Sequence, residues 1–261
     1  MNVNPLLCSP SPRDYPEVYE ALKKTGYARL YAKYFPEKIA YNLLRDWFLD
    51  HEEYTHMVIC PDDLIIEKEH VDTLIADLKE YDFPVLAGVC NVDMAKNKDY
   101  LCITENLPHP QRVVPERKQI GWRFYAWVHK DTKFPAPIVQ VPFSGFACQF
   151  IRRDIVKKYH FADDAKYNGT PELITGAIDV MFSNVCAIER IPLMIDTRVR
   201  MKHLKGGQRF FDIILGDGEL RFYHPRKDSF EKVYEEAKGK ERTWRMTGGD
   251  VVEGIVIDKE Q

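Results

Sequence analysis

Residues 56–66 read His-Met-Val-Ile-Cys-Pro-Asp-Asp-Leu-Ile-Ile, an apolar run that ends abruptly in two adjacent carboxylates. The apolar run is long enough for one buried strand. Charged pairs are costly inside a protein core unless something compensates them, and a divalent cation bound by carboxylate oxygens is one such compensation. In open α/β sheets, ligands bind at the carboxyl ends of the strands. The stretch therefore predicts a strand of an α/β sheet that carries Asp62 and Asp63 into a ligand site.

The segments around this stretch alternate between strand-like and helix-like patterns. Short apolar runs predict strands at 4–8, 27–34, 57–60 and 84–90, and apolar residues spaced three and four apart predict helices at 16–24, 37–50 and 69–81. This alternation predicts an α/β fold with a mostly parallel sheet flanked by helices.

The rest of the chain has a less regular pattern. Residues 91–137 are rich in proline, charge and aromatic residues and predict a small antiparallel excursion. Beyond it we expect strands at 138–141, 146–151 and 193–199, helices at 154–159 and 171–188, a loop at 201–207, a hairpin at 216–218 and a helix at 229–238. This pattern divides the chain into a main domain over 1–212 and a C-terminal hairpin and helix extension over 213–261, packed on the core or trailing from it.

Composition narrows the class of protein. The chain has 261 residues, of which 45% are apolar, and a formal net charge of −3. The apolar share can bury one substantial core, and the net charge gives no reason to expect a nucleic-acid partner. No apolar run approaches the roughly 20 residues that span a bilayer, and the first residues do not resemble a secretion signal. The six cysteines form no Cys-x-x-Cys pair, so we expect reduced thiols and a cytoplasmic location.

Three separated stretches carry a resemblance to a known family. They are the strand that ends in Asp62 and Asp63, the segment Pro-Phe-Ser-Gly-Phe-Ala-Cys-Gln-Phe-Ile-Arg-Arg at 142–153, and the segment with Ile-Asp-Val at 178–180, Ile-Asp-Thr at 195–197 and His203. In this order and spacing they resemble the GT-A fold of nucleotide-sugar-dependent glycosyltransferases, particularly the family-2-like group. The resemblance covers roughly residues 5–205, and it implies a Rossmann-like sheet and a catalytic domain over 1–212.

The resemblance implies a bound Mn²⁺ or Mg²⁺ ion that holds the diphosphate of the donor. In the family, an acidic motif after a central strand binds this ion, and here Pro61 stands where the first aspartate often stands. We therefore expect Asp63 to be a metal ligand, Asp62 to face metal or ribose, and His203 to be a further ligand. Without the resemblance, the acidic pair could equally be a turn or a helix cap, and His203 a solvated loop residue.

The resemblance also implies a general base. Inverting members of the family place an aspartate, commonly after a glutamate, at the start of a helix below the acceptor. Asp179 resembles it, with Ile178 in place of the glutamate. An aspartate in an apolar helical stretch is costly unless it has a role or a partner. Asp196 competes for the same role, and an exposed helix carboxylate is the alternative for Asp179.

Weaker correspondences imply contacts to the donor. Gly145 would let the backbone approach a sugar closely, although an ordinary turn explains it as well. Ser9 and Pro10 follow the first strand, where the family contacts the nucleobase. Asn42 and Arg45 lie on the second predicted helix, where some relatives place donor contacts, and a solvated helix residue explains Arg45 equally well.

Taken together, these features predict a metal-dependent glycosyltransferase of hexosyltransferase type, with Asp179 as an inverting base. The donor would be a nucleoside diphosphate sugar of UDP or GDP type, and the acceptor a glycan, a lipid or a protein. The sequence leaves open peripheral contact with a membrane, the oligomeric state, and inverting against retaining chemistry. Two alternatives remain: a non-catalytic module that binds nucleotide-sugars, and a sugar-phosphate nucleotidyltransferase. The second is weaker, because the segment after the first strand, residues 9–13, lacks the glycines that would grip a triphosphate.

Overall fold

The computed structural model describes residues 2–11, 15–33, 37–91, 100–106, 125–161, 164–165, 174–175, 177–204, 251–252 and 255–258. Within them, the central sheet has nine strands. In spatial order these are β15 (Val251–Val252), β16 (Ile255–Asp258), β2 (Arg29–Lys33), β1 (Pro5–Ser11), β3 (His56–Ile59), β10 (Gln149–Arg152), β5 (Val85–Val89), β13 (Leu193–Arg200) and β8 (Ile138–Gln140).

Six strands of this sheet run in one direction, the five described next and β15, which is antiparallel to β16 as β16 is to β2. Strands β2, β1 and β3 pair in parallel, as do β5 and β13. Strand β10 lies between β3 and β5 and pairs antiparallel with both, so the two parallel groups keep a common direction. The predicted α/β sheet is therefore confirmed as a mixed, largely parallel one, and its carboxyl edge gathers the residues that follow β3, β5 and β13.

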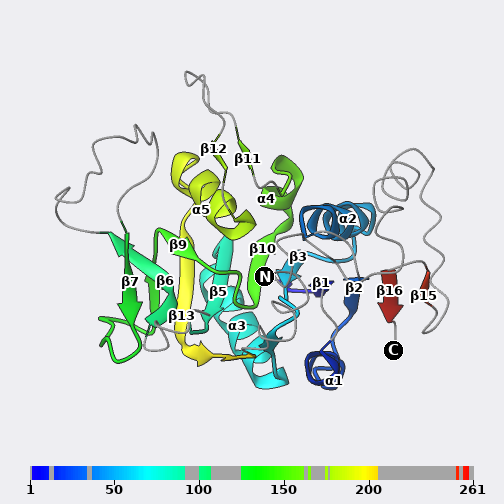
Figure 1. The fold of residues 1–261 in the computed structure, drawn as a ribbon, viewed down its shortest axis with the longest axis horizontal. Coiled ribbons are helices and arrows are strands. Elements are labelled where there is room, and N and C mark those ends of the chain that lie inside the picture. The colour runs from blue at the N-terminus through cyan, green and yellow to red at the C-terminus, as the bar shows by residue number, and fades with distance from the viewer. Residues whose placement is uncertain are drawn as a thin grey trace, which may run out of the picture.

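Helices cover both faces of the sheet (Figure 1). They are α1 (Pro16–Lys24), α2 (Glu37–Asp50), α3 (Lys68–Tyr81), α4 (Arg153–Lys158) and α5 (Ile178–Ile188). One face packs against α2, α4 and α5 in a core that includes Tyr41, Trp47, Phe146 and Phe182. The other face packs against α1 and α3, with Leu22, Leu74 and Leu78 buried. Apolar residues three and four positions apart give each helix one apolar side, and this side packs against the sheet.

Three small sheets complete the described fold. They are β7 (Tyr125–His129), β6 (Tyr100–Asn106) and β9 (Phe143–Ser144); β14 (Lys202–His203) and β4 (Leu64–Ile65); and β11 (Asp164–Ala165) and β12 (Ile174–Thr175). The first is antiparallel, as the sequence predicts for this part of the chain. The predicted hairpin at 216–218 and helix at 229–238 lie outside the described residues. Strand β16 pairs with β2, so part of the predicted extension joins the main sheet.

Some predicted boundaries are wrong, with identifiable causes. Strand β1 continues through Ser9 and Pro10 to Ser11 instead of ending at Cys8. In β1, the backbone of Leu7 bonds on the β2 side and the backbone of Cys8 bonds on the β3 side. Because these sides alternate along the strand, the backbone of Pro10 faces the β3 side, where the pairing with β3 ends at Cys8. The missing N–H of Pro10 therefore removes no ladder bond.

Two further boundaries differ around the fourth and fifth helices. The helix predicted at 171–188 begins only at Ile178, because residues 174–175 form a short strand. The strand predicted at 146–151 begins at Gln149, because Phe146 and Cys148 adopt positive φ angles of 45° and 48°, which are incompatible with a strand. The loop predicted at 201–207 contains the short strand β14.

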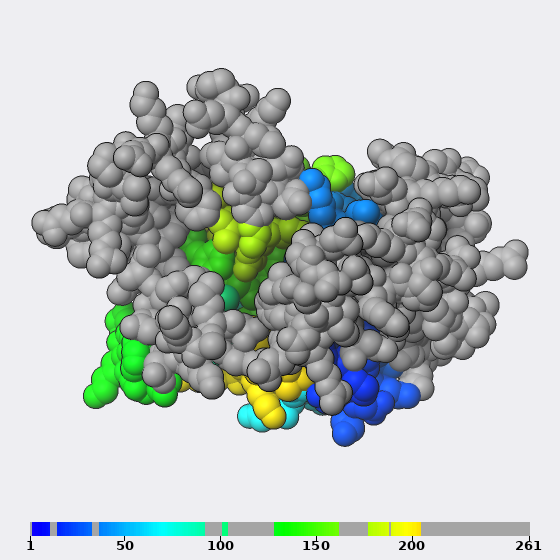
Figure 2. Space-filling view, in the orientation of Figure 1, coloured from blue at the N-terminus to red at the C-terminus, as the bar shows by residue number. Residues whose placement is uncertain are grey.

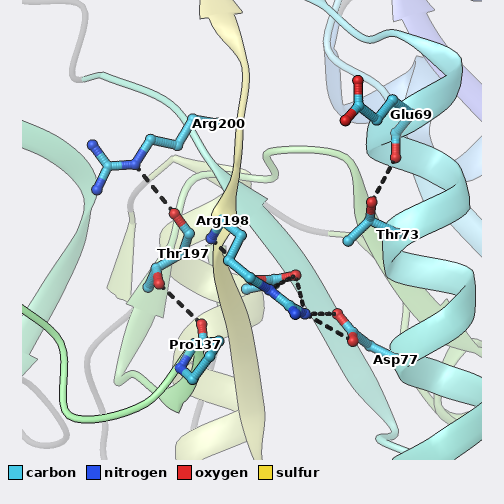
Figure 3. A network of polar contacts seen from close by, with 8 residues as sticks. Glu69, Thr73, Asp77, Pro137, Thr197, Arg198 and Arg200 are labelled. Carbon is cyan, nitrogen blue, oxygen red and sulfur yellow. Dashed lines mark hydrogen bonds and ion pairs between the residues drawn. The ribbon is translucent and has the colours of Figure 1, made fainter.

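An ion-pair network joins β13 to α3 (Figure 3). Arg198 donates hydrogen bonds of 2.9–3.1 Å to Asp196, which is fully buried, and of 2.9 Å to both oxygens of Asp77. Burial and the neighbouring Asp196 raise the pKa of Asp77 to about 6, whereas Arg198 opposes this rise. Asp196, the second candidate for the general base, is therefore held in a structural ion pair with Arg198.

Candidate active site

The acidic pair lies in a buried turn at the carboxyl edge of the sheet. All four residues of β3 are buried, and the following turn places Asp62 and Asp63 at only 3% and 8% exposure. The turn leads into β4, with the Leu64 N–H donating to the Pro61 carbonyl. The N-cap residue of the next helix is Glu67, so the pair does not cap a helix. These are therefore buried acids at the edge where ligands bind in α/β sheets.

His203 reaches Asp63 because β14 pairs antiparallel with β4. The register places His203 opposite Leu64, and the Leu204 N–H donates to the Asp63 carbonyl over 2.6 Å. This pairing brings His203 Nε2 to 3.1 Å from Asp63 Oδ2. Two side chains 140 residues apart in the sequence thus meet directly.

The second nitrogen of the His203 ring defines its tautomer. His203 Nδ1 lies 2.8 Å from the Asn91 carbonyl oxygen, which can only accept a hydrogen bond, so Nδ1 carries a proton. Nε2 and the Asp63 carboxylate oxygen can then both act as acceptors, so their 3.1 Å contact needs a proton between them or a cation bound by both. A histidine that binds a metal commonly donates its other N–H to a backbone carbonyl in this manner.

The Asp63–His203 pair fits a hard divalent cation. Adjacent ligands of an octahedral ion with bonds of about 2.1 Å lie about 3.0 Å apart, close to the 3.1 Å observed. The described part of the chain holds no group of three or more His, Cys, Asp or Glu side chains that could bind a metal ion. Mg²⁺ is commonly held by one or two carboxylates together with substrate phosphates and water, so a small protein ligand set suits such an ion.

Asp179 stands in the first turn of α5. Its Oδ1 accepts a 2.7 Å hydrogen bond from the Val180 N–H, which lowers the pKa of the carboxyl group. Burial outweighs this bond and raises the pKa of Asp179 to about 6. A carboxylate with this pKa accepts a proton more readily than an ordinary aspartate does and is still mostly ionised at neutral pH.

Asp179 and the acidic pair both contribute to the raised pKa values of two neighbouring groups. Burial raises the pKa of the Tyr41 hydroxyl, and the negative charges of Glu37, Asp179, Asp62 and Asp63 raise it further. A hydrogen bond with Cys102 and burial raise the pKa of the Cys90 thiol, and the charges of Asp63 and Asp179 raise it further. Tyr41 comes from α2 and Cys90 follows β5, so four separate segments converge at this edge of the sheet.

Gly145 lies against both Asp179 and Cys102. A Cβ atom placed on Gly145 would be 3.5 Å from Asp179 Oδ2 and only 2.3 Å from Cys102 Sγ. The Gly145 N–H also donates to the Cys102 carbonyl over 2.9 Å. The Cys102 side chain fills the space that a Cβ atom would need, so this position requires glycine. Figure 2 shows atoms of α5, and of the segment that includes β9 and β10, at the floor of a hollow on this face.

The remaining predicted contacts lie in structural positions. Ser9 and Pro10 are buried in β1 instead of forming a loop, although both lie near its carboxyl end. The Asn42 amide bonds the Phe161 backbone through both its oxygen and its nitrogen. Arg45 is buried and donates to the carbonyls of Val156, Lys157 and Tyr159 at the end of α4. Asn42 and Arg45 thus hold α2 to the segment at 156–161, and the structure does not bring them to Asp63.

Sequence reasoning missed four residues of this region: Tyr41, Cys90, Asn91 and Cys102. Cys90 and Asn91 had a usable signal, since Cys90 ends a predicted strand and Asn91 follows it, at the edge that carries Asp62. Tyr41 had none, because it occurs on the apolar face of a helix, where a core role is the ordinary explanation.

Comparison with known proteins supports the fold alone. The chain matches no protein-family model and no curated protein. It is similar in structure to A197 from STIV, with a TM-score of 0.50 and 14% sequence identity over 77% of this chain and 85% of that one. Among the described helices, none has the length and apolar character that crossing a membrane requires.

Proposed function

We propose that this chain is a metal-dependent glycosyltransferase of GT-A type, which moves a sugar from a nucleoside diphosphate sugar to an acceptor. One observation carries the proposal: a continuous set of contacts joins Asp63 to Asp179. Asp63 contacts His203, and Asn91 holds the His203 ring. The segment of Asn91 pairs with that of Cys102, which lies against Gly145 beside Asp179. A metal pair and a separate carboxylate with a raised pKa at one sheet edge are what sugar transfer from a diphosphate donor requires.

Asp63 and His203 would hold Mn²⁺ or Mg²⁺, with Asp62 beside them. The cation would neutralise the charge that develops on the departing diphosphate. The protein's own contribution is orientation: the Asn91 carbonyl fixes the ring of His203, and the β4–β14 pairing fixes its distance from Asp63. Burial of the acidic pair strengthens its electrostatic interaction with any bound cation.

Asp179 would accept the proton of the attacking hydroxyl group. Its pKa of about 6 keeps it mostly ionised at neutral pH and a stronger base than an ordinary aspartate. The hydrogen bond from the Val180 N–H holds Oδ1, which leaves Oδ2 directed at the face of Gly145. Because Gly145 has no side chain, the Cys102 sulfur can pack beside this oxygen, so an acceptor would have to approach Asp179 from another side.

The test is calorimetric titration of the full chain with UDP and with GDP, each with and without Mn²⁺. We expect binding of one nucleotide that depends on Mn²⁺ and weakens more than about 100-fold in Asp63→Asn, which removes a charged ligand. Asp131→Asn is the matched control, because Asp131 is an exposed acid outside the site. Unchanged affinity in Asp63→Asn would remove the central assignment.

Turnover separates the proposal from its strongest alternative. Release of UDP or GDP from UDP-glucose or GDP-mannose in the presence of Mn²⁺ supports an enzyme. The non-catalytic module predicts the same Mn²⁺-dependent nucleotide binding with no release above a blank. The substitutions of Pro61 and Ile178 for acidic residues of the family pattern are the features that favour this module.

A further inference from the structure

Two cysteines face each other beside the candidate site. Asn91 and Leu101 form an antiparallel bridge, which places Cys90 opposite Cys102 on the adjacent segments. The Cys102 N–H donates to the Cys90 carbonyl over 2.7 Å, which confirms this register. Side chains of directly opposed residues in antiparallel strands have Cβ atoms close enough for sulfur atoms to meet.

The two thiols already touch and differ in access. The register places the Cys90 and Cys102 thiols side by side and both are free, and a hydrogen bond with Cys102 is the largest cause of the raised pKa of Cys90. Cys90 is buried, with 4% exposure, whereas Cys102 is partly exposed. An oxidant can therefore reach Cys102 first, and Cys90 is positioned to complete the reaction.

We propose that Cys90 and Cys102 are an oxidisable thiol pair that closes to a disulfide at the rim of the candidate site and weakens cation binding there. The co-reactant is a small disulfide such as oxidised glutathione. The Cys102 thiolate attacks it, forms a mixed disulfide and releases one glutathione thiolate. The Cys90 thiol then attacks Cys102 Sγ, forms the internal disulfide and releases the second glutathione, whose sulfur takes up the Cys90 proton, so two protein thiols are oxidised and one disulfide is reduced.

Both cysteines are linked to residues of the candidate site. Cys90 immediately precedes Asn91, whose carbonyl oxygen holds the ring of His203. On the other side, the Cys102 sulfur occupies the space beside Gly145, next to Asp179. A sulfur–sulfur bond of about 2.05 Å pulls these segments together relative to two thiols in contact, so it disturbs the positions of Asn91 and Gly145. The effect on the cation rests on the proposed function, whereas the disulfide itself does not.

A second thiol pair provides a matched control. The Cys60 and Cys148 thiols are also in hydrogen-bonding contact, but both residues are fully buried on the face of the sheet that packs against α1 and α3. If contact alone decided the outcome, both pairs would oxidise. If access decides it, only Cys90 and Cys102 will react in the folded protein.

The test treats the folded full chain with oxidised glutathione, blocks the remaining thiols and maps the peptides by mass spectrometry. We expect a mixed disulfide at Cys102 first and then a peptide pair linked through Cys90 and Cys102, with Cys60 and Cys148 unmodified. Cys102→Ser should abolish the link and Cys148→Ser should leave it. A glutathione adduct at Cys102 that never resolves, or equal oxidation of both pairs, overturns the proposal.

Titration with Mn²⁺ then measures the effect of the disulfide on cation binding. We expect the oxidised chain to bind Mn²⁺ at least about tenfold more weakly than the reduced chain, with recovery after dithiothreitol, and Cys102→Ser to be insensitive to the oxidant. Equal affinity of the oxidised and reduced chains overturns the regulatory half. Absence of Mn²⁺ binding in the reduced chain overturns that half and the proposed function together, while the mapped disulfide still stands.

Discussion

Two groups of buried acids in this fold differ in the basic side chain that they contact. Asp77 and Asp196 share Arg198, a guanidinium that stays charged at any ordinary pH. Asp63 instead meets His203, whose ring can bind a proton, a metal or neither. The first group is neutralised by a permanent cation of the chain itself, whereas the charge of the partner in the second depends on a proton. This difference is the reason for proposing a ligand site at Asp63 and not at Asp77.

The comparison is sharper for the two acids with raised pKa values. Burial is the largest cause for Asp77 and for Asp179, and it brings the pKa of each to about 6. Asp77 is nevertheless held by two hydrogen bonds from Arg198. Asp179 accepts a bond from its own helix and has its other oxygen beside a glycine. The same pKa thus serves a structural contact in one place and is available for proton transfer in the other.

The largest expected effect is on catalysis, in Asp179→Asn. Asparagine retains an oxygen for the Val180 N–H but cannot accept a proton, so we expect the turnover of a nucleotide-sugar to fall about 1,000-fold. Nucleotide affinity with Mn²⁺ should change less than about threefold. In the wild type, turnover should rise with pH through about 6 as Asp179 loses its proton, and this step should be absent in the variant. A parallel loss of affinity and turnover would instead make Asp179 a binding residue.

The next effect is on stability, in Arg198→Met. It leaves Asp196 and Asp77 buried without their guanidinium, so we expect unfolding in urea to become easier by about 3 kcal/mol. This is the lower end of the range for a broken buried pair, because the Arg198 side chain is 51% exposed. Arg200→Met is the matched control on the same strand, since among the described residues Arg200 bonds the carbonyls of Thr197 and Lys130 and no carboxylate. Equal losses in the two variants would mean that the acids of this network need no cation.

Much of this fold is predictable because a half-buried helix or strand has apolar residues at regular spacings along the sequence. The helix at 37–50 was predicted with its observed ends, since its apolar face is continuous and polar residues bound it. The convergence of Asp62 with the residue after β5 also follows from the sheet, because parallel strands end at one edge. In both cases the information lies within a few residues of the feature.

The errors arise where distant segments decide the local structure. Pro10 can occupy β1 only because the pairing with β3 ends at Cys8, which the segment around Pro10 does not reveal. The proton on Nδ1 of His203 depends on the carbonyl of Asn91, 112 residues away in the sequence. The position of β10 between two parallel strands is likewise a tertiary choice. A single sequence contains no local signal for any of the three.

The smallest expected effect concerns pH and the stability of the network, in Asp77→Asn. The folded state raises the pKa of Asp77 from 3.8 to about 6, so folding favours the protonated form. The stability that this proton contributes is fully present below pH 3.8 and is lost as pH rises through about 6. The stability of wild type relative to Asp77→Asn should therefore increase by about 1 kcal/mol between pH 7.5 and pH 4.5. The gain stays below the full linkage value of about 1.4 kcal/mol per pKa unit, because Asp77 and Asp196 both bind Arg198 and interact with each other, so the change in charge is divided between them.

Asp72→Asn on the same helix provides the opposing control, because hydrogen bonds from Lys68 and Tyr27 lower the pKa of Asp72. The stability that Asp72 contributes is present above its unfolded pKa of 3.8 and is lost only as pH falls below that value. The stability of wild type relative to Asp72→Asn should therefore be flat between pH 7.5 and pH 4.5. Melting temperatures of wild type and the two variants between pH 7.5 and pH 4.5 test both expectations. If the Asp77 difference is also flat, Arg198 outweighs burial at Asp77, and a raised pKa would then distinguish Asp179, the proposed base, from the acids that only hold the fold together.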